Sequence, residues 1–504
     1  MSIVKFMIQL FDVCVMAYAA GYFLLNLALI LVSTRKISRE LRSEQLAPAG
    51  SAASDRFLPL VTLLVPAYNE EVTIAESLRS LLKLTYPAFE IVICNDGSKD
   101  KTLQVLLASF PFVPIDIEAS EHQLGSAPVR RCYELRGALP PGLKRMLLID
   151  KDNGGKADAL NACINMARGT YVTSMDADSL LIPDALLMAA RVILQSPEPI
   201  AAIGGQVGLS NGSLIKDGRV VEMRLPRTNI ARFQIVEYMR SFAQGRMAFA
   251  QLDALLVLSG VFALMRRDLV VSIGGFLTKH ARSRITEEYC GKGAHTVCED
   301  MEVVVRMHRY LLDHGFPGRV KLLPFAVAWT EAPENYRDLG KQRARWYRGL
   351  LEVLTYHRAV LFRPRFRGIG LFAMPYQLIF EAACPLLEAF GIASLPASVS
   401  IGVFTWGGVL ALFLLAIAAN FCLNTLSVWL CIHSEQPAPG IQGSSLFAYR
   451  AFKDAARLVV AGFFSNLGYR QYLVFWQLRG LWDFLRGKKG WDKFARKGFA
   501  LGPG

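Results

Sequence analysis

Residues Tyr171–Ser179 read YVTSMDADS, a short apolar run that ends in two carboxylates one residue apart. In an extended strand, side chains at positions i and i+2 point to the same face, so Asp176 and Asp178 are expected to face one ligand together. Carboxylate oxygens suit a divalent cation such as Mg²⁺ or Mn²⁺ and its bound phosphates. The stretch therefore indicates a metal and nucleotide site, or, in a simpler interpretation, a polar strand exit, because aspartate is common in turns.

The chain has 504 residues, of which 53% are hydrophobic, and a formal net charge of +14. Many of its basic residues flank long apolar runs, as at Arg35–Arg39 and Arg363–Arg367. Such placement is typical of cytoplasmic retention and of contact with anionic lipid headgroups, and it argues against a nucleic-acid partner. The nine cysteines are scattered singly, without the spacing of a disulfide framework, which favours a reducing cytosolic environment for the soluble part.

Uncharged runs at both ends of the chain enclose a more polar middle. Three of these runs are long enough to cross a bilayer: Leu10–Val32, Ile369–Leu395 and Val399–Cys431. The first lacks a signal-peptide cleavage site, so we expect an uncleaved anchor with the polar middle in the cytosol. The expected order is a transmembrane anchor (1–35), a linker (36–56), a cytosolic α/β domain (57–335), interfacial helices (336–366), transmembrane helices (367–432), and a re-entrant or interfacial hairpin with a basic tail (433–504).

The middle region alternates apolar strands with amphipathic helices, which predicts a mostly parallel sheet. Ligands of such sheets bind beyond the carboxyl ends of the strands. Tyr68, Asn69 and Glu70 follow the strand at 60–66, and Asp96 follows the strand at 90–94. An aspartate there can accept a hydrogen bond from a base or a ribose, although either loop alone is also compatible with an ordinary turn.

Two further turns predict close approach of a ligand. Gly154–Gly155–Lys156 opens a helix, and glycines with a lysine at a helix N-terminus form an anion site, although the spacing is not that of a Walker motif. Ser259–Gly260 forms a small turn inside an apolar run and suits close approach of a substrate, with structural packing as the equal alternative.

Two helices carry the remaining candidates. Glu299 and Asp300 open one helix, where acids are also stabilised by the helix macrodipole without any chemistry. Gln342, Arg345 and Trp346 share one face of another by their i, i+3, i+4 spacing. An amide and a guanidinium can hold diphosphate oxygens and an indole offers a flat face to a sugar, whereas the alternative is a basic helix at the membrane surface.

In this order the motifs VPAYNE (65–70), NDGS (95–98), GKA (155–157), DAD (176–178), ED (299–300) and QRARW (342–346) resemble those of the membrane-embedded family 2 glycosyltransferases. That family includes cellulose, hyaluronan and chitin synthases, and the chain is most similar to the bacterial poly-N-acetylglucosamine synthases. The resemblance covers residues 10–395 and implies a cytosolic GT-A fold with a Rossmann-like mixed sheet, inserted between the N-terminal and C-terminal transmembrane helices. It further implies inverting, processive transfer from a UDP-sugar, with UDP-GlcNAc favoured, to a nascent β-glycan that is moved across a bacterial inner membrane.

The resemblance also implies roles for single residues. Asp300 would be the catalytic base, and Asp176 with Asp178 would hold Mg²⁺ or Mn²⁺. The nucleotide-sugar site would comprise Tyr68, Asn69, Glu70, Asp96, Lys156, Asp176, Gln342 and Arg345. The acceptor site would comprise Ser259, Gly260, Glu299 and Trp346. Such enzymes work in the lipid bilayer, sometimes with accessory membrane or periplasmic subunits.

The polar segment Thr278–His295 is longer than the family pattern suggests. Together with the residues that follow it, the segment contains His280, Cys290, His295 and Cys298, a spacing that is not standard for zinc. A loop that gates the substrate or binds a partner is the favoured interpretation. Two other functions stay open at this stage, namely a single-addition transferase acting on a lipid-linked acceptor and a catalytically silent scaffold for polysaccharide assembly.

Overall fold

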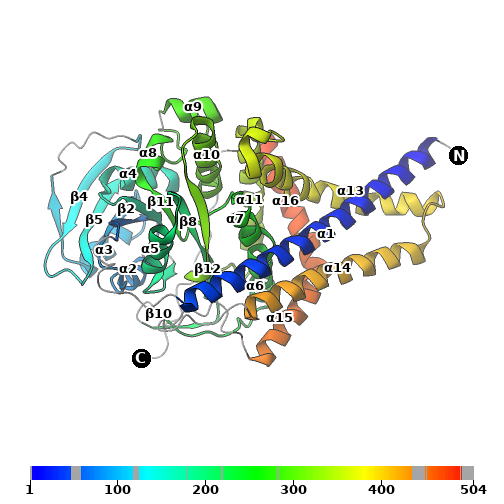
Figure 1. Ribbon diagram of the computed structural model, residues 1–504, viewed down its shortest axis with the longest axis horizontal. Coiled ribbons are helices and arrows are strands. Elements are labelled where there is room, and N and C mark those ends of the chain that lie inside the picture. The colour runs from blue at the N-terminus through cyan, green and yellow to red at the C-terminus, as the bar shows by residue number, and fades with distance from the viewer. Residues whose placement is uncertain are drawn as a thin grey trace.

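The structure is a computed structural model that describes residues 3–46, 58–116, 124–177, 179–216, 219–280, 283–433, 449, 451–488 and 490. It consists of an α/β domain from which long helices extend to one side (Figure 1). Asp178, the second of the paired carboxylates, lies outside the described residues, as does most of the expected basic tail. The expected α/β domain between apolar helices is confirmed.

The domain is built on a ten-stranded sheet with the order β3-β4-β5-β2-β1-β6-β11-β8-β12-β7. The strands are β1 (Val61–Ala67), β2 (Phe89–Asp96), β3 (Phe112–Ile115), β4 (Val129–Leu135), β5 (Leu143–Lys151), β6 (Tyr171–Ser174), β7 (Leu180–Leu181), β8 (Ile200–Leu209), β11 (Ala263–Arg266) and β12 (Arg319–Thr330). A separate hairpin pairs β9 (Leu214–Lys216) with β10 (Arg219–Glu222).

The sheet is mixed, as the resemblance implies, and not mostly parallel as the alternation of strands and helices alone predicted. Its central strands and the pair β8–β12 are parallel, whereas its other pairs are antiparallel. Strands β5, β2, β1 and β6 run parallel, whereas β4 and β11 pair antiparallel with the edges of this group. Every residue of β2 and β8 is buried, as expected for strands covered on both faces. The parallel centre brings the carboxyl ends of β1, β2, β5 and β6 to one edge of the sheet.

The helices of the domain cover the sheet and carry several of the sequence motifs. They are α2 (Ile74–Leu81), α3 (Thr102–Ser109), α4 (Lys156–Met166), α5 (Ala185–Gln195), α6 (Asn229–Arg240), the π-helix η2 (Ser241–Arg246), α7 (Met247–Gln251), α8 (Arg267–Ser272), α9 (Arg284–Cys290), α10 (Glu299–His314) and α11 (Tyr336–Tyr356). The expected loop at 278–295 therefore contains a helix, α9, and residues 281 and 282 lie outside the described part.

The strand that precedes Asp176 is shorter than expected. β6 ends at Ser174, and Asp176 follows it in irregular backbone before a turn at Ala177. Asp176 therefore does not take its direction from the alternation of side chains along a strand, in which positions i and i+2 share a face. The backbone of Met175 still donates to the carbonyl of Leu64 at 3.0 Å, which keeps this exit beside β1.

Three helical segments are long and apolar enough to cross a membrane: Lys5–Thr34, Ile369–Ser400 and Trp406–Ile432. The first belongs to α1 (Ile3–Leu46), which continues as helix through the first part of the expected linker at 36–56. The third belongs to α14 (Trp406–His433) and begins after a break, whereas the sequence suggested a span from Val399. In Figure 1, α1, α13 (Cys384–Ser400) and α14 extend together away from the sheet.

The second apolar segment is irregular before α13. It contains the π-helices η5 (Ile369–Ala373) and η6 (Gln377–Ala382) around the single turn α12 (Met374–Tyr376). Pro375 and Pro385 lie in it, and proline removes a backbone donor and kinks a helix. Glu381 lies in the second of these π-helices.

The C-terminal region forms a hairpin of α15 (Phe452–Phe464) and α16 (Arg470–Leu485), joined at the kinked segment η7 (Ser465–Tyr469). α16 packs closely against α11 because glycines lie at the contact. A Cβ atom on Gly480 would lie 2.4 Å from the carbonyl oxygen of Ala344, and one on Gly340 would lie 2.2 Å from the indole of Trp476. The hairpin is thereby attached to the helix that carries Gln342–Trp346.

Candidate active site

One cavity of about 1320 Å³ gathers most of the residues singled out in the sequence. Its walls come from the carboxyl ends of the central strands, the turn before β11, and the helices α10 and α11. The candidates that line it are Tyr68, Glu70, Asp96, Lys156, Asp176, Ser259, Gly260, Glu299, Asp300, Gln342, Arg345 and Trp346. Motifs separated by up to 278 positions, from Tyr68 to Trp346, therefore share one site.

Lys156 lies at the centre of the charged groups. Its ammonium nitrogen is 2.6 Å from Asp176 Oδ1 and 3.1 Å from Glu299 Oε1. Burial alone would lower the pKa of Lys156, but the charges of Asp176 and Glu299 outweigh burial and raise that pKa. Lys156 thus stays protonated and holds the end of β6 against the start of α10.

Gly260 brings backbone into the middle of this group. A Cβ atom at Gly260 would lie 2.8 Å from Lys156 Nζ and 4.0 Å from an oxygen of both Asp176 and Asp300. The two carboxylates therefore face the same point from opposite elements. Only glycine leaves that point open for a ligand, which favours the substrate interpretation of the Ser259–Gly260 turn over simple packing.

Asp300 occupies the first turn of α10 and is a candidate proton acceptor. Burial raises the pKa of its carboxyl to about 6, and the neighbouring charge of Glu299 adds to the rise. The positive charges of Lys156 and Arg246 lower the pKa of Asp300, but by less than the rise. A carboxyl with this pKa is close to the value that suits a general base near neutral pH.

Asp96 is buried, and its carboxylate already accepts four hydrogen bonds. Lys151 Nζ and the amide of Gly154 donate to Oδ1 at 2.5 and 3.0 Å, and the amide of Gly155 and Asn153 Nδ2 donate to Oδ2 at 2.8 and 3.2 Å. Asp96 therefore positions the loop that leads into α4. A contact with a nucleobase, as the resemblance implies, would have to share one of these oxygens.

Lys151 is fully buried between two aspartates. Its ammonium lies 2.5 Å from Asp96 and 2.7 Å from Asp158, whose other oxygen is 2.7 Å from the ring of His280. Burial lowers the pKa of Lys151, but the hydrogen bonds that its ammonium donates to the two carboxylates produce a net rise in that pKa. The loop at 152–155, which leads into α4, therefore depends on a buried network in which one ammonium is shared by two carboxylates.

The first sequence motif divides between the cavity and its support. Tyr68 and Glu70 line the cavity, but Asn69 does not. Asn69 has a φ of 53°, a left-handed conformation that asparagine tolerates, and its side chain accepts from the amide of Lys99 at 2.8 Å. Asn69 thus joins the loops after β1 and β2, and its contact with the nucleotide stays a prediction.

The predicted face of α11 is present in the cavity. Gln342 has a buried Oε1 atom with no hydrogen-bond partner among the described residues, so this oxygen is available to a ligand. The guanidinium of Arg343 lies 4.6 Å from the ring centroid of Trp346 and covers one indole face. Arg343 is itself fixed by an ion pair of 2.5 Å with Glu237.

The cavity continues from these groups toward the apolar helices. Tyr22, Arg240, Glu381 and Arg470 also line it. Acidic residues at membrane depth usually face a bundle interior or a wet cavity, and Glu381 does so here. Arg240 donates to the hydroxyl of Tyr22 at 2.7 Å and to Asn420 and Asn424 of α14 at 3.2 and 3.3 Å. Polar groups therefore line one continuous path from the sheet edge into the helix bundle.

Comparison of the sequence with known protein families identifies two matching family models. The model of Glycosyl transferase family group 2 matches residues 171–432, more than half of the chain, and that of Glycosyl transferase family 2 matches residues 62–118. The chain belongs to glycosyl transferase family group 2. Its mixed sheet with flanking helices is the GT-A fold of such glycosyltransferases.

Curated relatives of this glycosyltransferase include two named poly-beta-1,6-N-acetyl-D-glucosamine synthases. The protein of Staphylococcus epidermidis is 26% identical over 299 residues, and that of Staphylococcus aureus (strain COL) is 27% identical over 297 residues. Each match covers 58% of this chain and 55% of the relative, so the chain spans about half the length of the curated relatives it matches.

Among solved structures, a mannosyltransferase from Pyrobaculum calidifontis has the same fold. It superposes with a TM-score of 0.52 at 19% identity, covering 96% of this chain and all of the other. The similarity extends over the sheet and the helices together.

Three cationic residues of the glycosyltransferase site did not emerge from the sequence. Arg246 lines the cavity and faces Asp300, Arg240 lines its extension, and Lys151 supports Asp96. Arg240 and Arg246 lie in a mostly apolar helical stretch at 229–251. Charged residues in such a stretch are rarely buried without a partner, so they could have been identified from the sequence as candidate site residues. Lys151 follows a buried strand at its carboxyl end, the position already used to find Asp96.

The four residues weighed as a zinc set do not assemble. His280 bonds to Asp158, Cys298 Sγ lies 3.7 Å from the carbonyl oxygen of Trp346, and the carbonyl oxygen of His295 accepts from Tyr356 at 2.8 Å. Cys290 instead meets Glu302 and His357. Helix α9 separates Cys290 from His280, so spacing along the chain was a poor guide to proximity.

The buried network around Lys151 predicts a large loss of stability on its removal. Lys151→Met leaves the carboxylates of Asp96 and Asp158 buried without their countercharge, and breaking such a pair costs about 3–5 kcal/mol. A clear fall in Tm of the purified protein in detergent is the expected result. Arg130→Met is the matched control, because its ion pair with Asp152 is about half exposed and is worth about 0–1 kcal/mol. Equal Tm values for the two variants would contradict the structural role of Lys151.

Proposed function

We propose that the chain transfers a sugar from a UDP-sugar, with UDP-GlcNAc favoured, to the end of a growing β-linked glycan, and that the glycan then passes through the membrane. One observation carries the proposal: a single cavity contains both the carboxylates at the sheet edge and polar groups between apolar helices. The names of the curated relatives support N-acetylglucosamine as the transferred sugar.

The donor would occupy the end of the cavity near β6 and α4. Asp176 offers carboxylate oxygens that face the cavity, a donor type that suits Mg²⁺ or Mn²⁺. Such a cation, when bound, supplies positive charge to the departing diphosphate. The related mannosyltransferase was solved with GDP-Man and Mn²⁺, in agreement with a nucleotide-sugar and a divalent cation. Gln342 and Arg345 would hold the diphosphate oxygens from α11.

Transfer would proceed in one displacement. Asp300 takes the proton of the acceptor hydroxyl as that oxygen attacks the anomeric carbon, and the bond to the diphosphate breaks on the opposite side. The anomeric configuration is therefore inverted. Lys156, between Asp176 and Glu299, would keep the two acidic elements at a fixed separation during this step.

The acceptor would reach the site from the side of the apolar helices. Trp346 lines the cavity with one face covered by Arg343, and we propose that a sugar ring of the glycan packs on the other. Beyond it, Tyr22, Arg240 and Glu381 provide hydrogen-bonding groups for a polar chain. We place these helices in a bacterial inner membrane with the α/β domain in the cytosol. A single-addition transferase would not need this extension.

Enzymatic transfer is tested with full-length protein in nanodiscs containing Mg²⁺ or Mn²⁺. We expect UDP release and polymer formation with UDP-GlcNAc in preference to UDP-glucose and UDP-glucuronate. Asp300→Asn should slow transfer by about 10²- to 10⁴-fold, because a general base is lost, while UDP affinity is kept. Arg130→Met, which alters an exposed ion pair away from the cavity, is the control. Unchanged turnover in Asp300→Asn would refute the assigned base, and no UDP release with any donor would support the scaffold alternative.

The pKa of Asp300 predicts an acid limb in the pH profile. Because the base works only when ionised and its pKa is raised to about 6, kcat/KM should fall as the pH drops through about 6 and level off above it. Glu299→Gln removes the like charge beside Asp300 and should move the limb to lower pH. If the acid limb does not move in Glu299→Gln, or persists in the residual activity of Asp300→Asn, the limb reports the ionisation of another group.

Substitution of Trp346 should separate donor binding from polymer synthesis. In Trp346→Ala we expect UDP affinity to be kept and polymer formation to fall by about 100-fold, since displacement of a reacting group by about 1 Å costs this much. Trp346→Phe keeps a flat ring and should retain most of the synthesis. The measurement compares UDP affinity, UDP release and product length in the same vesicles. Full-length polymer from Trp346→Ala would exclude the residue as the acceptor platform.

A further inference from the structure

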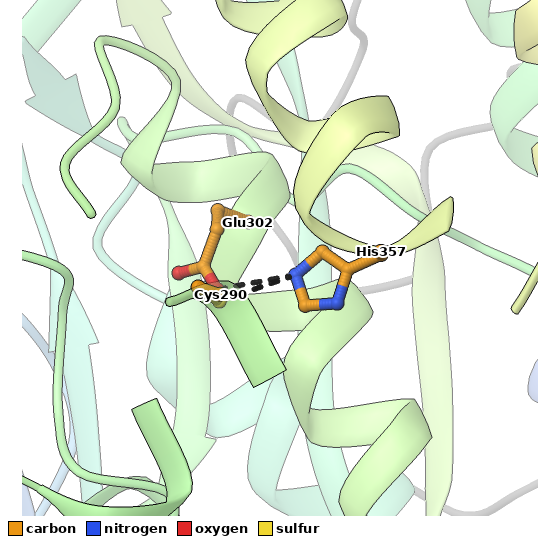
Figure 2. Close-up of side chains that lie close together, drawn as sticks. All are labelled: Cys290, Glu302 and His357. Atoms are coloured by element: carbon orange, nitrogen blue, oxygen red, sulfur yellow. Dashed lines mark hydrogen bonds and ion pairs between the residues drawn. The ribbon is translucent and has the colours of Figure 1, made fainter. Parts of the chain in front are cut away.

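Cys290, Glu302 and His357 come together, as Figure 2 shows. None of the three lines the cavity of the proposed transfer site. Cys290 ends α9, Glu302 lies in the first turn of α10, and His357 follows the last residue of α11. Glu302 and His357 are fully buried, and Cys290 is partly buried. Three helices that are distant in sequence thus each contribute one potential metal ligand.

The three donor atoms form a compact triangle. Cys290 Sγ lies 3.4 Å from Glu302 Oε1 and 3.9 Å from His357 Nε2, and that nitrogen lies 3.3 Å from the same oxygen. Zinc bond lengths of about 2.0–2.3 Å at tetrahedral angles give ligand separations of about 3.3–3.6 Å. The distance between nitrogen and oxygen exceeds the usual range of about 2.7–3.2 Å for an N–H···O hydrogen bond. Two edges of the triangle lie within the zinc range of about 3.3–3.6 Å, and the 3.9 Å edge from Cys290 Sγ to His357 Nε2 lies above it. A small shift of the Cys290 side chain would therefore give one face of a zinc tetrahedron.

We propose that Cys290, Glu302 and His357 bind one Zn²⁺, with a water molecule in the fourth position. A thiolate, an imidazole and a carboxylate are the donors that zinc takes in proteins, and the sulfur and nitrogen atoms disfavour Mg²⁺ and Mn²⁺. The site is therefore chemically distinct from the oxygen donors at Asp176. The proposal does not depend on the transfer reaction.

Binding sets the protonation states of the ligands. Zinc takes a neutral imidazole and a thiolate, so binding releases the proton of the Cys290 thiol to solvent. Arg306 donates to both oxygens of Glu302 at 2.8 Å and can keep its bond to Oε2. Zn²⁺, the thiolate, the carboxylate and Arg306 then carry one net positive charge, so we expect an ion that chelators remove.

Binding of Zn²⁺ would fix the positions of helices that carry residues of the proposed transfer site. Glu302 lies two residues after Asp300, and His357 terminates the helix that carries Gln342, Arg345 and Trp346. A cation shared by α9, α10 and α11 would fix these helices relative to one another. The segment that departs from the family pattern, through Cys290, would thereby stabilise the catalytic part of the site.

The experiment uses the full chain in nanodiscs, purified without a histidine tag. After incubation with Zn²⁺ and dialysis, we expect one tightly held equivalent per chain by elemental mass spectrometry. Substitution of a ligand, in Cys290→Ala or His357→Gln, should lower the bound zinc by about tenfold or more. His295→Ala is the matched control and should retain the metal, since its side chain is not part of the cluster.

Replacement by Co²⁺ gives a readout that does not depend on the variants. Wild-type protein should show a thiolate-to-cobalt charge-transfer absorption that disappears on chelation. Absence of this band, zinc below about a tenth of an equivalent, or undiminished zinc in Cys290→Ala would overturn the proposal. Because no UDP-sugar is present, none of these outcomes bears on the transfer reaction. In activity assays, inhibition by EDTA that Mg²⁺ alone reverses would report on the Asp176 site instead.

Discussion

The buried ion pairs of Lys151 with Asp96 and Asp158 hold the part of the site where we propose that the nucleotide-sugar binds. The ammonium joins Asp96 at the end of β2 to Asp158 in α4, and Asp96 in turn accepts from the amides of Gly154 and Gly155. A charged group without exposure is tolerated only when its partners are fixed, so the network holds the loop in one conformation. That loop sets the start of α4, and with it the position of Lys156 between Asp176 and Glu299.

A second constraint comes from the contact between the sheet domain and the apolar helices. Arg240 connects α6 to both α1 and α14, and glycines at 340 and 480 allow α16 to lie against α11. These contacts hold α11 between the sheet edge and the helix bundle. A side chain on α11 can therefore face the proposed reaction site while its helix packs on elements that continue into the apolar helices.

The Cys290–Glu302–His357 cluster adds a third connection, on the other side of α10. Arg306 binds Glu302 and also donates to the backbone carbonyls of Ile273 and Gly275, so the first turns of α10 are attached to the turn after α8. Asp300 thus lies on a helix that is held from several directions. A proton acceptor must keep its geometry within a fraction of an ångström, and buried charge pairs supply this rigidity better than apolar contacts alone.

The sequence by itself determined the central strands and the residue types at their ends. Apolar runs located β1, β2 and β6, and the carboxyl ends of these strands located Tyr68, Asp96 and Asp176, because strand period and ligand placement are local or topological rules. Only the tertiary structure decided that Asn69 supports a loop, that Asp96 is saturated by Lys151 and two glycine amides, and that Cys290 meets His357 rather than His295. The reason is physical: hydrogen-bond partners and burial are set by segments that are distant in sequence, and a pattern along the chain carries no information on which of them meet.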